Sequence, residues 1–455
     1  MPTPFAQNKS NPKLKKLLII SPYFAPINAA DAHRVRTSIS FYADNGWIPE
    51  VVAVDPRYCD MVQDDLLLNS VPQHIKIHLV KALDKRWTAK IGLGSIALRS
   101  LIFYFKAVNK LLQSRDYDLI FFSTTQFPTL ALAAIWKKRF KTRIVFDIQD
   151  PWHSTYYLSK PKHERPKKFW LSYYLNKMLE PYAMQAADGL ISVSAGYLEV
   201  LQQRYPHLRS KPMATIPFGM HLPDMEIAQQ NKLIAHSMCL EGVCTPGAVV
   251  PHRISCFNLV YIGRGGHDLL PAFRHLRSAV QVGLKKYPEV FRKLKVHLYG
   301  TSYAPKGSGK STFIQEQDAE NLKGIFQETT DRLPYYQTLN TLKAADMLFI
   351  PGPDQADYVA SKLYPYLMVQ RPILAIVHPL SAVSTILRTI PQASVFHIHK
   401  DDAMKSSQIT ECLRDAILSL KSISVAEADT LKHHSAEHFT RLQTNLFDQV
   451  CQTPD

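Results

Sequence analysis

Glycine and cysteine are both scarce in this chain. Only 17 of 455 residues are glycine, and no G-x-G-x-x-G motif occurs, which argues against a nicotinamide-binding fingerprint and a long glycine-rich phosphate loop. The six cysteines are scattered without paired spacing, and only a short apolar run, residues 17–20, follows the charged N-terminal segment. We therefore expect no signal peptide and a reducing, cytoplasmic compartment.

Long apolar runs and acidic residues are also in short supply. The longest apolar run, residues 91–105, is interrupted by Arg99 and falls short of the roughly 20 residues that cross a bilayer. The 54 Lys and Arg outnumber the 38 Asp and Glu, which gives a formal net charge of +16. This excess favours an anionic partner, which charge alone leaves open between nucleic acid, an acidic membrane surface and a phosphorylated small molecule.

Short apolar runs alternate with longer amphipathic segments along the chain, a pattern typical of parallel α/β sheets. Seven strand candidates precede residue 219, and five more lie between residues 258 and 398. The pattern predicts two doubly wound domains, residues 1–222 and 257–401, joined by a linker at 223–256 and followed by a helical tail at 402–455. By spacing alone, an inserted surface loop explains 223–256 as well as a linker does.

Two motifs resemble known sites but lack essential parts. The segment GSGKST at 307–312 would need glycine at position 304 to complete a phosphate-binding loop, and Ala304 stands there. The letters HSAEH at 434–438 match a zinc peptidase pattern, but no glutamate follows to serve as a third ligand. A basic surface turn and a solvated helix face explain these segments better.

Polar residues follow several of the predicted strands in the first half. Arg34 lies at the start of a predicted helix after the first strand, where it could meet an anion together with free backbone N–H groups. Gln149, Asp150 and His153 follow the fifth strand. Asp147 and Asp150 are equally well explained as caps of a helix or turn.

In the second half, a strand leads into Gly263-Arg264-Gly265-Gly266 and then a helix. Flexible glycines beside a guanidinium suit a diphosphate, which arginine can bind with two parallel hydrogen bonds. A plain turn with a solvated arginine is the alternative. Lys362 precedes another predicted helix and offers a second positive charge.

Taken together, these blocks resemble glycosyltransferase family 4, whose members have the two-Rossmann-domain GT-B architecture with a C-terminal helix that returns toward the N-terminal domain. The order and spacing of the blocks carry the resemblance over essentially the whole chain, more than any one of them does. Beside the Arg34 segment, the matching blocks are residues 46–49, 123–128 (STTQFP), 147–152 (DIQDPW), 262–266, 300–305 (GTSYAP) and 360–366.

The resemblance implies transfer of a sugar from a nucleotide-diphosphate donor, held mainly by the C-terminal domain, to an acceptor held by the N-terminal domain. It implies retention of anomeric configuration, with no metal and no cofactor beyond the donor. The catalytic residues it implies are Arg264, Lys362, Asp357 and Asp150. The donor-binding residues are Gly263, Gly265, Gly266, Thr301, Ser361 and Arg332, and the acceptor-side residues are Arg34, Gln149 and His153.

The chain departs from the family at two places. The family commonly has two glutamates eight positions apart, where this chain has Asp357 and Pro365. The side chain of Pro365 cannot hold ribose hydroxyls. Gln149 stands where a histidine is common. A non-catalytic binding or scaffold protein with the same fold is therefore the alternative to an enzyme of bacterial surface-glycan synthesis.

Basic and aromatic residues are interleaved at 85–105 and 160–180. Such segments suit an anionic bilayer, where glycan acceptors linked to polyprenyl or other lipids reside. A solvated basic face with its aromatics turned into the core is the alternative. We expect peripheral association with the inner face of the cytoplasmic membrane. We expect no nucleic-acid partner, since the basic residues are spread over both halves without a recognised module.

Overall fold

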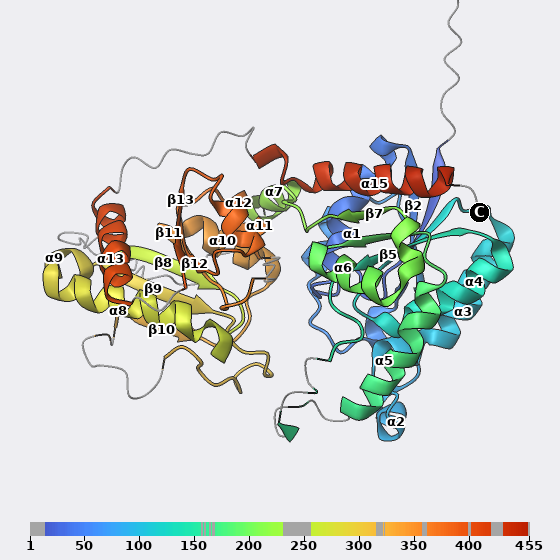
Figure 1. Cartoon of the computed structure of the whole chain (residues 1–455), viewed down its shortest axis with the longest axis horizontal. Helices are drawn as coiled ribbons and strands as arrows, with labels where there is room; N and C mark the ends of the chain where they lie inside the picture. Colours follow the sequence, from blue (N-terminus) through green and yellow to red (C-terminus); the bar gives the residue numbers. More distant parts are fainter. Residues whose placement is uncertain are drawn as a thin grey trace, which may run out of the picture. The chain divides into compact units, whose positions relative to one another are not determined.

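The computed structural model describes residues 14–155, 158, 161–162, 165, 169–230, 256–314, 322, 324–356, 362–398, 402–419 and 431–453. The chain divides into two compact units. Unit 1 comprises residues 1–219 and 436–455, and unit 2 comprises residues 220–435. Each unit is a parallel α/β domain, as the sequence predicts (Figure 1).

Unit 1 contains a seven-stranded parallel sheet in the order β3-β2-β1-β4-β5-β6-β7. The central strands are buried because helices cover both faces, which explains their continuous apolar runs. The strand order reverses between β1 and β4, the place where open α/β sheets bind ligands. The strands are β1 (Lys15–Ile20), β2 (Trp47–Val54), β3 (Lys76–Val80), β4 (Leu119–Ser123), β5 (Arg143–Ile148), β6 (Gly189–Ser192) and β7 (Met213–Thr215).

The helices of unit 1 follow from local sequence signals. In α3, the Ser95 side chain accepts a hydrogen bond from the backbone N–H of Leu98 and caps the helix, and Tyr104 and Val108 are buried four residues apart on one face. The α-helices are α1 (Ala32–Ser38), α2 (Lys85–Thr88), α3 (Ile96–Ser114), α4 (Leu132–Phe140), α5 (Phe169–Met184), α6 (Ala195–Arg204) and α15 (Ala436–Gln452).

The C-terminal helix α15 belongs to unit 1, and Figure 1 shows it in red along β7 and β2. Phe447 is fully buried, with its ring centroid 5.6 Å from that of Trp47 and 5.0 Å from that of Phe121. Asp448 accepts hydrogen bonds from Lys15 Nζ (2.7 Å) and Trp47 Nε1 (3.1 Å). Helix α15, which follows the rest of unit 1 after more than 200 residues of unit 2, therefore completes the core of unit 1. This agrees with the C-terminal helix that we expect, from the sequence, to return to the N-terminal domain.

Unit 2 contains a six-stranded parallel sheet in the order β10-β9-β8-β11-β12-β13. Here the strand order reverses between β8 and β11. The strands are β8 (Phe257–Ile262), β9 (Leu294–Tyr299), β10 (Phe326–Thr329), β11 (Met347–Pro351), β12 (Ile373–Val377) and β13 (Ala393–His397). The α-helices are α7 (Pro223–Gln230), α8 (Leu270–Lys286), α9 (Pro288–Phe291), α10 (Tyr335–Ala344), α11 (Leu363–Met368), α12 (Ala382–Leu387) and α13 (Asp402–Leu418).

The compact units have bounds other than the expected domain ranges. Helix α7, which lies in the expected linker, packs on α10 through Asp224, whose carboxylate accepts hydrogen bonds from the Tyr335 and Tyr336 hydroxyls at 2.8 and 3.3 Å. Helix α13 packs on α8, where the Thr410 hydroxyl donates to the carbonyl of Ala279 (2.8 Å). The expected tail therefore divides, with α13 in unit 2 and α15 in unit 1.

Candidate functional site

A tight loop at the carboxyl end of β8 forms the base of the candidate site in unit 2. The backbone N–H of Gly265 donates to the carbonyl of Thr301 (2.7 Å), which ties the β8 loop to the β9 loop. A Cβ at Gly265 would lie 2.7 Å from that carbonyl and from Thr312 Oγ1. Glycine is required here because no side chain fits between the two loops.

Arg264 projects from this loop with its side chain about one-third exposed. Its guanidinium donates two hydrogen bonds to Asp268, at 2.9 and 2.6 Å. The ion pair lowers the pKa of the Asp268 carboxyl. Asp268 thus fixes the position of the Arg264 guanidinium beside the loop. A bound diphosphate would compete with Asp268 for the N–H donors of this guanidinium.

The Lys362 side chain approaches the same loop at Gly263. Its Nζ is 3.5 Å from the Tyr261 hydroxyl and 5.6 Å from the centre of the Tyr261 ring, and the same hydroxyl donates to the carbonyl of Arg264 (2.8 Å). A Cβ at Gly263 would collide with Lys362 Nζ, so glycine permits this approach. Burial, together with repulsion by Arg264 and Arg332, lowers the pKa of Lys362 to about 7.

Arg332 follows β10, and its guanidinium lies 4.4 Å from the ring centre of Tyr303, which follows β9. Thr301 is buried, and its hydroxyl donates to Glu328 (2.6 Å). Thr301 therefore supports the loop through its carbonyl and hydroxyl. Arg264, Arg332 and Lys362 bring three basic side chains to the carboxyl end of this sheet, beside the point where its strand order reverses.

The end of the segment that resembles a phosphate-binding loop is bound by a carboxylate of the protein itself. The Glu328 carboxylate accepts hydrogen bonds from the backbone N–H groups of Thr312, Phe313 and Ile314 at 2.8 to 3.0 Å. A carboxylate thus occupies donors that a phosphate-binding loop would offer to its ligand. The geometry agrees with the prediction of a surface turn at 307–312.

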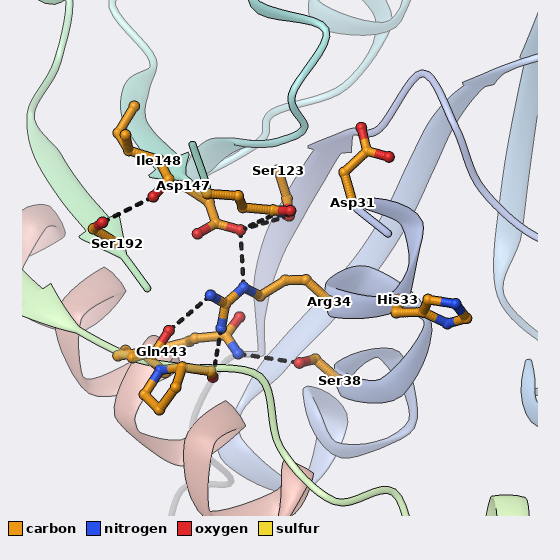
Figure 2. A network of polar contacts seen from close by, with 12 residues as sticks. Asp31, His33, Arg34, Ser38, Ser123, Asp147, Ile148, Ser192 and Gln443 are labelled. Carbon is orange, nitrogen blue, oxygen red and sulfur yellow. Dashed lines mark hydrogen bonds and ion pairs between the residues drawn. The ribbon is translucent and has the colours of Figure 1, made fainter. Parts of the chain in front are cut away.

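In unit 1, Arg34 is the centre of a buried network at the carboxyl ends of β4 and β5 (Figure 2). Its guanidinium donates to Asp147 (2.9 Å) and to the carbonyls of Ile216 (2.7 Å) and Pro217 (2.9 Å). The Arg34 side chain is 2% exposed and that of Asp147 is fully buried. Arg34 therefore links α1, β5 and the segment after β7, with its guanidinium directed at protein groups.

Gln149 belongs to the same network. Its amide nitrogen donates to Asp147 (2.7 Å) and to the Ser123 hydroxyl (3.1 Å), and Ser123 in turn donates to Asp147 (2.8 Å). Asp147 Oδ2 thus accepts three hydrogen bonds, whereas Oδ1 is buried without a hydrogen-bond partner in the described part of the chain. Gln149 orients the Asp147 carboxylate.

Asp31 and Asp150 are the titratable carboxyl groups beside this network. Asp31 accepts hydrogen bonds from the Thr125 N–H and from the hydroxyls of Thr124 and Thr125, at 3.0 to 3.1 Å. Figure 2 shows its carboxylate pointing away from Arg34. Burial raises the pKa of Asp31, and burial together with the Asp31 charge raises the pKa of Asp150. Asp150 is at least partly open to solvent and can meet a ligand.

The backbone of His153 is hydrogen-bonded to side chains of α5 and α6. Its backbone N–H donates to Glu180 (2.7 Å), and its carbonyl accepts from Arg204 (3.2 Å). Burial, followed by the charge of Arg204, lowers the pKa of the imidazole. Its ring centroid lies 4.9 Å from that of Tyr173, so His153 faces α5.

The structure brings Arg264, Lys362, Arg332 and the three glycines together in unit 2, and Arg34, Gln149 and Asp150 at one edge of unit 1. Asp357 and Ser361 lie outside the described residues. Sequence reasoning missed Asp31, Tyr261, Asp268 and Glu328, which support or neutralise the predicted residues. The ion pair of Arg264 with Asp268 joins residues close together in the sequence, four positions apart.

The second failed motif is also explained by the structure. Helix α15 begins at Ala436, so His434 and His438 do not share a helix. In the described part of the chain, no cluster of three or more His, Cys, Asp or Glu could hold a metal ion. The helices described also include none with the length and apolar character of a membrane span.

Comparisons with known proteins agree with this architecture. Residues 83–222 match the model of Glycosyltransferase Family 4. A comparison with curated proteins gives no match.

Solved structures align over nearly the whole chain. Sucrose-phosphate synthase from Thermosynechococcus elongatus is 12% identical, with a TM-score of 0.54 over 96% of this chain and 98% of its own. The α,α-trehalose-phosphate synthase (UDP-forming) from Burkholderia xenovorans, in complex with glucose-6-phosphate, is 11% identical, with a TM-score of 0.59 over 95% and 100%. An E. coli trehalose-6-phosphate structure bound with UDP-2-fluoro glucose is 12% identical, with a TM-score of 0.53 over 97% and 100%.

These likenesses confirm the GT-B fold and the resemblance to glycosyltransferase family 4. The matched residues run from the end of β3 to the start of unit 2 and include Asp147, Gln149, Asp150 and His153. Together the family match and the fold support a glycosyltransferase.

Proposed function

We propose that this protein transfers a sugar from a nucleotide-diphosphate donor to a glycan or lipid-linked acceptor in the synthesis of bacterial surface polysaccharide. One observation carries the proposal. Three basic side chains, those of Arg264, Arg332 and Lys362, lie close together beside a glycine-bearing loop at the carboxyl end of the unit 2 sheet. Such an arrangement suits two adjacent phosphates better than any uncharged ligand.

The chemistry of the proposed reaction explains why the cations are needed. When the bond between the sugar and the diphosphate breaks, negative charge grows on the leaving oxygen while the sugar gains oxocarbenium character. Arg264 and Lys362 stabilise that charge, and pre-positioned donors of this kind each contribute about 100- to 1,000-fold in rate. We propose that these side chains serve in place of a metal ion, and that a leaving-group oxygen takes the acceptor proton as the configuration is retained.

The remaining predicted residues receive roles in the same scheme. Asp357 would accept hydrogen bonds from hydroxyls of the donor sugar, and Ser361 would bind the donor beside Lys362. On the acceptor side, Asp150 is the group whose raised pKa and exposure suit contact with an acceptor hydroxyl. Arg34 and Gln149 position the surrounding backbone from inside the buried network.

The ligands of similar structures agree with this donor and acceptor chemistry. The E. coli structure holds UDP-2-fluoro glucose, and the Burkholderia enzyme holds glucose-6-phosphate. We propose that this chain likewise uses a nucleotide sugar, and that it works in the reducing cytoplasm, where its acceptor is reached at the membrane surface.

A donor screen tests the proposal. The purified chain is incubated with UDP-, GDP- and ADP-glucose, and release of the nucleoside diphosphate is measured with and without added chelator. We expect one nucleotide to be turned over at a rate that the chelator leaves unchanged. Absence of turnover with every nucleotide sugar tried, in the presence of membrane extract as acceptor, would contradict the proposal.

A non-catalytic binding or scaffold protein is the second candidate, favoured by Pro365. This residue lies in α11, where the family commonly has a glutamate for the ribose. Titration calorimetry with UDP, GDP and ADP separates the two candidates, because the scaffold would bind none of them and the enzyme would bind at least one.

A further inference from the structure

An aromatic and basic surface of unit 1 lies outside the sites described so far. On α5, Trp170, Leu171, Tyr174, Met178 and Tyr182 are between 45% and 72% exposed. Four of them are spaced four residues apart, so they follow one side of the helix. The opposite side of α5 is buried through Ala183 and Glu180.

Helix α2 extends this surface. Trp87 on α2 is 70% exposed, one of the largest exposures among the apolar side chains of the described residues. A short 3-10 turn and Gly92 follow α2. A Cβ added at Gly92 would lie 2.8 Å from the Leu171 side chain of α5. The two helices are therefore neighbours, and Figure 1 shows α2 beside the lower end of α5.

Positive charge surrounds the apolar side chains. Lys90 Nζ lies 5.0 Å from the ring centre of Trp87, and the Arg165 guanidinium lies 5.6 Å from that of Trp170. Lys177 is exposed on the same helix, and the one described acidic residue of α5, Glu180, is buried and paired with Arg204. Exposed tryptophan and tyrosine rings flanked by lysine and arginine are typical of a surface that rests in the headgroup region of an anionic bilayer.

We propose that the exposed faces of α2 and α5, defined by Trp87, Trp170, Leu171, Tyr174 and Met178, dock this protein on an anionic phospholipid bilayer. The inference deepens the proposed function, because it names the surface through which the chain would reach a lipid-linked acceptor. The aromatic side chains of Trp87, Trp170 and Tyr174 are 48–70% exposed, which favours the membrane interpretation for α2 and α5, whereas Tyr104 of the first basic segment is fully buried, as the alternative expects. Charge complementarity selects the anionic lipid surface as the partner.

The test uses the purified full chain and vesicles of phosphatidylcholine with or without phosphatidylglycerol. The apolar variant carries Trp87→Ser, Trp170→Ser, Tyr174→Ser and Met178→Ser. A matched control replaces four apolar residues elsewhere that are 61–75% exposed, Val62, Leu380, Met404 and Leu418, by serine. We expect wild type and control to float with anionic vesicles only, and the apolar variant to bind at least tenfold more weakly.

Charge and fluorescence give independent readouts. Lys90→Gln combined with Lys177→Gln should weaken binding by about 25-fold, because each cation near an anionic surface contributes about fivefold. Trp47, Trp136 and Trp152 are at most 5% exposed, so a change in tryptophan emission on adding vesicles reports on Trp87 and Trp170. We expect a blue shift with anionic vesicles, and none with the apolar variant.

The proposal is overturned if wild type fails to float with anionic vesicles, or if the apolar variant and the control bind equally. It is also overturned if wild type sediments as a dimer that the apolar variant dissociates, since the surface would then join two copies. Release of nucleoside diphosphate in solution should be the same in wild type and the apolar variant. If the wild type fails to float but still releases nucleoside diphosphate, docking alone is refuted. If the wild type floats but turns over no nucleotide sugar, the proposed function alone is refuted.

Discussion

Lys362 gives the sharpest prediction about the donor site, because its protonation should control donor affinity. Its pKa of about 7 means that half of the free protein lacks this charge near neutral pH. A bound diphosphate stabilises the ammonium form, so binding above pH 7 takes up a proton. For a pKa of 7 and one coupled proton, affinity should fall about tenfold from pH 6 to pH 8, which equals about 1.4 kcal/mol.

The same pKa has a consequence for stability. Because the folded-state pKa is lowered from its usual 10.5, the unfolded chain holds the proton between pH 7 and 10.5 while the folded chain has lost it. The contribution of Lys362 to the free energy of unfolding therefore rises with pH across that window. Replacement by methionine should remove this rise, as urea unfolding at pH 7 and pH 9.5 would show.

Titration calorimetry with UDP-glucose at pH 6, 7, 8 and 9 measures the linkage directly, since the two phosphates of a nucleotide sugar stay ionised throughout. Buffers of different ionisation enthalpy report the proton uptake, expected to approach one per site above pH 8. Lys362→Arg keeps its charge over the whole range and should show no pH dependence. Identical pH profiles in wild type and Lys362→Arg would show that protonation of Lys362 does not control donor affinity.

Three further changes test other parts of the structure. Arg34→Met leaves Asp147 charged and buried, and should lower the free energy of unfolding in urea by about 3 to 5 kcal/mol. Arg86→Ala, which removes the ion pair with Asp84 on the surface, should leave this free energy nearly unchanged, and equal effects of the two changes would contradict the buried network. Gly265→Ala forces a methyl group against the Thr301 carbonyl, so it should lower the free energy of unfolding by about 1 to 3 kcal/mol and weaken UDP-glucose binding. Wild-type affinity of this variant in calorimetry would contradict the loop geometry. Asp31→Asn should gain stability relative to wild type as pH rises from 4 to 7, because burial raises the folded-state pKa of Asp31 and its ionisation then opposes folding; a relative loss over that range in urea unfolding would show the opposite sign.

The fold was predictable where burial dominates the sequence pattern. The sequence predicts all seven strands of unit 1 and five of the six in unit 2. The signal is strongest in central strands such as β4, β11 and β12, whose residues are all buried because helices cover both faces of each sheet. β10 was missed because it is an edge strand that carries Gln327 and Glu328 and is only partly buried. The helix predicted to start near Arg34 ends at Ser38, and two 3-10 turns follow it up to Gly46, whose φ is +81°.

The site was predictable only at the level of loops. Sequence places Arg264 and Lys362 after strands of one sheet, and parallel strands bring such loops to one edge. It could not show that Arg34 is directed at Asp147, 113 residues away, or that Glu328 holds the turn at 312–314, because these pairings depend on the tertiary fold. Sequence therefore predicts which loops form the site, but not the residues with which the predicted site residues pair.

Release of nucleoside diphosphate by the Arg264→Ala variant measures whether the Arg264 guanidinium stabilises the departing diphosphate. The matched control is Arg292→Ala, another arginine of unit 2, which pairs with Glu289 on the surface. With the nucleotide sugar that wild type uses, we expect Arg264→Ala to lower kcat about 100-fold or more and the control to keep the wild-type rate. Equal turnover by Arg264→Ala and wild type would show that Arg264 has no role in stabilising the departing diphosphate.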